Sequence, residues 1–106
     1  MAKFMVKARY TAEGARGLLK DGGSARVAAV TKAIKKVGGK VEAFYFAYGP
    51  ADAIVIVDVP DDASGLALSL AVNASGTVTC ELVPLITAKQ MDDAAKVNVN
   101  YKAPGQ

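Results

Sequence analysis

Five side chains in the first half of the chain could bind or act on a small aromatic molecule. Four of them are aromatic: Tyr10, Tyr45, Phe46 and Tyr48. They could line a pocket for an aromatic or quinone-like ligand, in which Tyr48 or Asp52 could act as a general base. The alternative is that the aromatic residues pack in the core and at an interface, and that Asp52 is a turn carboxylate that accepts hydrogen bonds from nearby backbone N–H groups.

A second candidate site lies where two glycines precede a helical pattern. Gly22 and Gly23 are followed by Ser24 and Arg26. The free N–H groups of such a helix start, with Ser24 and Arg26, could hold a carboxylate or a phosphate. The alternative is an ordinary loop in which Ser24 caps the helix. The phosphate-binding loop pattern Gly-x-x-x-x-Gly-Lys-Ser/Thr is absent.

Residues that could hold a metal or act as a nucleophile are few. The chain has no histidine, which removes the commonest metal ligand and the commonest general base. Asp92 and Asp93 lack the spacing and the companions of a metal site, so we expect no metal and no cofactor. Cys80 is the single cysteine and can form no internal disulfide; we expect an inert, packed thiol in a reducing compartment.

Composition indicates one globular domain over residues 1–106, with a tail over residues 97–106. Hydrophobic residues make up 52% of the 106 residues, which is too many for a disordered chain. The net charge of +3 comes from 13 basic and 10 acidic residues that are interleaved, so we expect no nucleic-acid partner. No signal-peptide core and no apolar run of about 20 residues is present, so we expect no membrane partner and a cytoplasmic location.

The stretch over residues 40–60 organises the rest of the chain. Two runs of aromatic or β-branched residues flank Gly49-Pro50, a pattern that predicts a β-hairpin. Alternating apolar residues predict two more strands, over residues 3–10 and 77–86. Pro84 indicates that the latter is an edge strand.

Helical patterns fill the intervals between these strands. Thr11 and Ser24 are the expected N-caps of the first two helices, and residues 63–74 form a third that is rich in Ala and Leu. Thr87 with Gln90 is a capping box that opens a short C-terminal helix. The order strand, helix, strand, strand, helix, strand predicts an α+β, ferredoxin-like split βαβ fold with the helices on one face of an antiparallel sheet.

Sorting the strand residues by parity predicts two unlike faces. The set expected under the helices is uncharged and comprises Phe4, Val6, Ala8, Val41, Ala43, Tyr45, Ala47, Ala53, Val55, Val57, Val78, Cys80 and Leu82. The other set mixes charges with large apolar groups and comprises Lys7, Arg9, Glu42, Phe44, Phe46, Tyr48, Asp52, Ile54, Ile56, Asp58, Thr79, Glu81 and Val83. A solvated face needs no such apolar groups, so we expect a second copy to cover it and form a homodimer or a larger homo-oligomer.

Two details of this assignment depend on strand register. We expect Lys7 and Arg9 to pair with Asp58 and Glu42 across the second face. This grouping requires a three-residue turn or a bulge in the hairpin. A turn of only Gly49-Pro50 would instead direct the aromatic residues toward the helices.

Several stretches resemble the GYD family, which is named for Gly, Tyr and Asp at the hairpin turn. They are MAKFMVKA (1–8), YTAEG (10–14), GLLK (17–20), GGSAR (22–26), GGK (38–40), EAFYF (42–46) and DVP (58–60). Gly49 and Asp52 of the turn are present, but Ala51 stands where the family has Tyr. The resemblance therefore implies that any ligand contact made by that Tyr is lost here.

The resemblance implies a fold of the dimeric α/β-barrel group and no particular activity. We therefore expect a small homo-oligomeric protein that binds a small organic or anionic ligand through some of Tyr10, Ser24, Arg26, Tyr45, Tyr48 and Asp52. One alternative is a cofactor-independent oxygenase or isomerase acting on an aromatic or polyketide-like substrate, with Tyr48 and Asp52 as catalytic residues. Another is a structural assembly module that binds no ligand.

Overall fold

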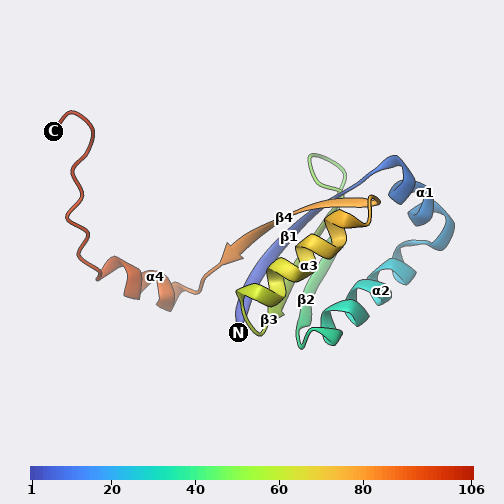
Figure 1. Ribbon diagram of the computed structural model, residues 1–106, viewed down its shortest axis with the longest axis horizontal. Helices are drawn as coiled ribbons and strands as arrows, with labels where there is room; N and C mark the ends of the chain where they lie inside the picture. Colours follow the sequence, from blue (N-terminus) through green and yellow to red (C-terminus); the bar gives the residue numbers. More distant parts are fainter.

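The computed structural model describes all residues from 1 to 106, and its strands and helices follow the predicted order (Figure 1). The elements are β1 (Ala2–Tyr10), α1 (Ala12–Asp21), α2 (Gly23–Lys36), β2 (Lys40–Phe46), β3 (Ala53–Val59), α3 (Asp62–Ala74), β4 (Val78–Leu85) and α4 (Ala88–Ala95). The four strands form one antiparallel sheet in the order β2-β3-β1-β4. This order is that of the ferredoxin-like split βαβ motif, so the predicted α+β fold is confirmed.

The core lies between the two central strands and the helices. Phe4 of β1 and Val57 of β3 are paired, and both are buried with Ile34 of α2. Along β3 every second residue is buried, which is why its β-branched sequence forms a central strand. Pro84 lies in β4, an edge strand as predicted, where its missing N–H removes no bond to a second neighbour.

Side-chain caps begin three of the helices. Thr11 accepts a hydrogen bond from the Gly14 N–H (3.2 Å) at the start of α1, and Thr87 and Gln90 form the predicted reciprocal capping box of α4. Asp61 caps α3 in the same way. The predicted capping role of Ser24 is wrong. The single residue Gly22, at φ 86°, both ends α1 and begins α2, so Ser24 already lies inside the helix.

The predicted facing of β2 is wrong beyond Val41. Val41 pairs with Val57, but the next paired residue is Ala43, opposite Ile56. Glu42 is therefore an extra residue in a β-bulge, and every later side chain of β2 changes sides.

The bulge places the aromatic residues of β2 against the helices. Phe44 packs against the core, and Phe46 lies close to Gly23 at the start of α2. Their rings are 5.2 Å apart between centroids. Ala43 and Tyr45 point to the opposite side. The alternative placement of the aromatic residues is thus the one observed, with a bulge in β2 as its cause and not a shorter turn.

We call the side of the sheet that faces away from the helices the open face. The strand register arranges it in three rows that run across β2, β3, β1 and β4. The middle row is apolar and consists of Ala43, Ile56, Met5 and Val83. The rows on either side carry charges and consist of Lys40, Asp58, Lys3 and Leu85, and of Tyr45, Ile54, Lys7 and Glu81.

The ion pairs of the open face differ from those predicted. Register places Lys3 opposite Asp58 and places Lys7 opposite Ile54. Lys3 therefore pairs with Asp58 (3.2 Å) and with Glu42. The hydrogen bond to Glu42, and to a smaller extent the one to Asp58, raises the pKa of Lys3 above its ordinary value of 10.5.

The predicted partner of Arg9 is also wrong. Its guanidinium lies 4.0 Å from the Asp52 carboxylate and donates hydrogen bonds to the carbonyls of Gly49 and Pro50 (3.1 and 3.2 Å). Because these partners all belong to the hairpin loop, Arg9 holds that loop against the end of β1.

The chain beyond β4 lies away from the body of the protein, with α4 followed by an extended tail (Figure 1). Residues 97–106 form no strand, although Val97, Val99 and Tyr101 alternate as a strand would. None of the helices combines the length and the apolar character needed to cross a bilayer.

Candidate functional site

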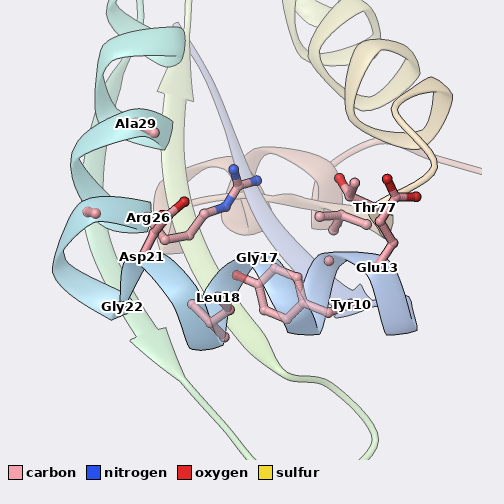
Figure 2. A pocket seen from close by; sticks show the side chains of 12 residues that line it. Tyr10, Glu13, Gly17, Leu18, Asp21, Gly22, Arg26, Ala29 and Thr77 are labelled. Carbon is pink, nitrogen blue, oxygen red and sulfur yellow. The ribbon is translucent and has the colours of Figure 1, made fainter.

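A cavity of about 220 Å³ lies between α1, the first turns of α2, the end of β1 and the start of β4 (Figure 2). Its polar lining residues include Tyr10, Glu13, Asp21, Arg26 and Thr77. Residues 10 and 77 are far apart in sequence and meet because β1 and β4 are neighbours in the sheet. The fold therefore collects polar side chains from β1, α1, α2 and the turn before β4 around one space.

Two hydrogen bonds donated by Thr11 fix α1 as one wall of this cavity. The Thr11 N–H donates to the Thr77 carbonyl (3.0 Å), and the Thr11 hydroxyl donates to the Gly76 carbonyl (2.9 Å). Gly14 then lies against the same backbone, so closely that a β-carbon there would be 1.9 Å from the Thr77 oxygen. Glycine is required at this close approach.

Arg26, Tyr10 and Thr77 are the half-buried polar residues of the cavity, and Arg26 and Tyr10 have the long side chains among them. Figure 2 shows their side chains reaching from different walls toward its middle. The four ion pairs and the side-chain hydrogen bonds of the chain involve neither the Arg26 guanidinium nor the Tyr10 hydroxyl. The carboxylates of Glu13 and Asp21 belong to exposed residues at the rim. The inner part of the cavity thus offers an unpaired cation and a free phenol.

An apolar pocket of about 60 Å³ adjoins the cavity between the sheet and helices α2 and α3. Thirteen of its 15 lining residues are hydrophobic, among them Val30, Phe44 and Leu68. Tyr10 and Arg26 line both spaces. They therefore stand where a polar chamber meets an apolar one, an arrangement that suits a ligand with a charged head and an apolar body.

The other predicted ligand-binding residues lie outside both spaces. Tyr45 points from the open face with 71% of its surface exposed, and Tyr48 is fully exposed at the hairpin loop. Ser24 is exposed on α2. Asp52 accepts a hydrogen bond from the backbone N–H of Tyr10 (2.9 Å), as the turn-carboxylate alternative describes. Of the six candidates, the fold brings together only Tyr10 and Arg26.

Glu13 and Thr77 line the cavity but carry no sequence signal for it. Thr77 reaches the site only through the pairing of β1 with β4, which residue type alone does not reveal. Cys80 faces the helices as predicted and lines the apolar pocket, with its Sγ 3.8 Å from the Ser69 hydroxyl. No group of three or more His, Cys, Asp or Glu side chains is arranged to hold a metal ion.

The topology and the cavity define a ferredoxin-like α+β protein with a small-molecule-sized space between its first two helices and the edge of its sheet. The chain belongs to the GYD domain family, whose family model matches residues 4–95 and so covers most of the protein. This match confirms the resemblance seen in the sequence. No curated protein and no solved structure matches the chain significantly.

Proposed function

We propose that this protein is a small homo-oligomeric binding protein whose ligand is an amphipathic organic anion held in the cavity beside Arg26. The charged head would lie between Arg26 and Tyr10, and the apolar body would extend toward the pocket under the sheet. The half-buried, unpaired Arg26 is the observation that carries this proposal.

Arg26 is half-buried as a residue and its guanidinium has no ion-pair partner within the chain, so an anion that enters the cavity meets an unpaired cation. A carboxylate or phosphate would supply that pair, and the planar guanidinium can bind either one with two parallel hydrogen bonds. The first turn of α2 adds backbone N–H groups that no side chain caps. The Tyr10 hydroxyl can donate one further hydrogen bond.

The size of the two spaces limits the ligand. Volumes of about 220 and about 60 Å³ place the site near the lower end of the usual range of about 300–1,000 Å³ for ligand pockets. Small aromatic acids and medium-chain fatty acids fit this chemistry, whereas a nucleotide is too large.

The experiment compares the binding of benzoate and of decanoate with the binding of the corresponding neutral alcohols. Binding is measured by isothermal calorimetry and by NMR of the Arg26 side chain. The acids are expected to bind and the alcohols to bind weakly. Arg26→Gln should weaken acid binding about 10–100-fold, the value of one charge-assisted contact. Arg16→Gln is the matched control, since Arg16 is exposed on α1 and does not line the cavity. Equal affinity for acid and alcohol, or for wild type and Arg26→Gln, would reject the proposal.

We also propose that a second copy of this chain covers the open face. Support comes from its middle row, which is apolar across all four strands and flanked by rows that carry both signs of charge. Such a surface matches itself when turned by a two-fold axis, because the apolar rows meet and the charged rows can pair.

Light scattering on a size-exclusion column tests this interface. The wild type is expected near twice the chain mass of 10.9 kDa, and Ile56→Lys is expected to dissociate it. Ala28→Lys adds the same charge on the exposed side of α2 and should leave the dimer intact. A wild-type monomer at micromolar concentration would refute the proposal.

A further inference from the structure

The C-terminal arm, residues 86–106, carries five of the twelve large apolar side chains that are exposed. Its large apolar side chains are each more than half exposed: Ile86, Met91, Val97, Val99 and Tyr101. No strand or helix of the body packs closely against α4 (Figure 1). A soluble protein rarely leaves so many apolar side chains in one segment without a contact.

The arm nevertheless carries the signals of an ordered segment. α4 begins with a complete capping box, yet a helix of eight residues is marginal in water unless it packs against something. After it, Val97, Val99 and Tyr101 alternate with Asn98 and Asn100, the pattern of a half-buried strand. In the single chain this strand pattern has no neighbouring strand to pair with.

The sheet offers an edge that could receive such a strand. Both edge strands have an unpaired side, but β4 is interrupted by Pro84, which cannot donate a hydrogen bond. β2 contains no proline, and beyond its bulge residues 43–46 run regularly. Tyr45 and Phe46 are also partly exposed there, at 71% and 43%. β2 is therefore the less protected edge.

The arm does not lie near this edge within its own chain. It leaves β4 at Leu85, and β4 and β2 are at opposite edges of the sheet. Figure 1 shows the arm directed away from the body rather than across it. The arm could instead pair with β2 of a second copy, and this pairing would give a neighbour both to β2 and to the strand pattern of the arm.

The area of the open face also favours an additional contact. Four strands about 4.8 Å apart and about seven residues long give a face of only about 450 Å². A standard interface buries about 800 Å² on each partner. The arm carries five exposed apolar side chains that would enlarge an interface built on this small face.

We propose that residues 97–101 of one copy add as a strand to β2 of a second copy, with α4 spanning the gap, and that the exchange is reciprocal. This inference rests on the proposed dimer. Reciprocal exchange closes the assembly at two copies and leaves neither β2 nor the arm unpaired.

Paramagnetic broadening between chains tests the contact directly. A nitroxide is attached at Lys102→Cys in a Cys80→Ser background, and this labelled chain is mixed with ¹⁵N-labelled wild type. Because the label and the observed amides are on different copies, only a contact between chains broadens signals. Strong broadening of residues 40–46, removed by reducing the nitroxide, is the expected result. Broadening confined to β4 or to the helices, or none, would overturn the inference.

Two variants separate this inference from the proposed dimer. A chain that ends after Lys96 is expected to raise the dimer dissociation constant about 30-fold or more, because the truncation removes three apolar side chains, Val97, Val99 and Tyr101, from the interface. Val99→Ser should act in the same direction, and Asn98→Ser is the matched control on the other side of the strand. If the shortened chain dimerises as tightly as wild type while Ile56→Lys dissociates it, the arm inference fails and the open-face dimer stands. If the full chain is a monomer, both fail.

Discussion

Replacement of Gly14 by Ala tests whether α1 is held against the backbone of the α3–β4 turn. In an exposed helix this change normally stabilises a protein by about 1 kcal/mol, since Ala is the best helix former and Gly one of the worst. Here the added β-carbon would lie 1.9 Å from the Thr77 carbonyl oxygen and 2.9 Å from its carbon. Backbone atoms cannot swing aside as a flexible side chain can, so α1 must move.

The expected sign is therefore the opposite of the usual one. Displacing a packed element costs about 1–3 kcal/mol, and the 3.0 Å hydrogen bond from Thr11 to Thr77 is worth about 0.5–1.5 kcal/mol. After subtraction of the propensity gain of about 1 kcal/mol, we expect Gly14→Ala to lower the free energy of unfolding by about 0.5–3.5 kcal/mol.

Gly17→Ala is the matched control. It lies one turn further along the same helix and has open space around the position of an added β-carbon. We expect it to raise the free energy of unfolding by about 0.5–1 kcal/mol. The assay is urea unfolding at fixed protein concentration, because the stability of an oligomer depends on concentration. If both variants were stabilised equally, the close approach of α1 to Thr77 would be refuted.

Three further experiments test other parts of the structure. Ile34→Ala, at a side chain that is 1% exposed, should lower the free energy of unfolding by about 2–5 kcal/mol, whereas Leu19→Ala, at 87% exposure, should change it by under about 0.5 kcal/mol in the same urea assay. Hydrogen bonds from the Ser64 backbone N–H and, to a smaller extent, the Ser64 hydroxyl lower the pKa of Asp61 below 3.8. The stabilisation that Asp61 gives is therefore complete above pH 3.8 and is lost as the pH falls through the lowered pKa. Asp61→Ala should destabilise the protein at pH 7, and the difference in unfolding free energy between this variant and wild type should shrink in an acid titration. Asp58→Ala and Lys3→Met should be non-additive in a double-mutant cycle because the two residues are paired, and a cycle with Lys7→Met in place of Lys3→Met should be additive.

The fold could be predicted from sequence because local signals agreed with one another. The alternation in the first and last strands, the capping box at Thr87 and the edge proline each predicted the element that formed. These signals act over a few residues, so they can be interpreted without knowing how distant parts of the chain pair.

What the sequence did not reveal depends on pairing between distant residues. The bulge at Glu42 arises from the way β2 pairs with β3, and no residue type in β2 indicates it. The ion pairs followed the register of β1 against β3, which placed Lys3 rather than Lys7 opposite Asp58. The cavity depended in the same way on Thr77 meeting α1 across the sheet.

The bulge makes the length of β2 matter as much as its composition. Deleting Glu42 would only remove the bulge, because Ala43 would then follow Val41 directly and Phe44 would still face the helices. One residue inserted between Ala43 and Phe44 would instead shift all later pairing by one and turn Phe44 and Phe46 away from the helices. The core would then lose two aromatic rings, and these rings would be exposed on the open face. The loop over residues 47–52 tolerates a change of length more easily, because its residues form no strand and need not alternate between the two sides of the sheet. Changes of chain length should therefore accumulate in this loop during the divergence of the family, while the segment from Ala43 to Phe46 keeps its length.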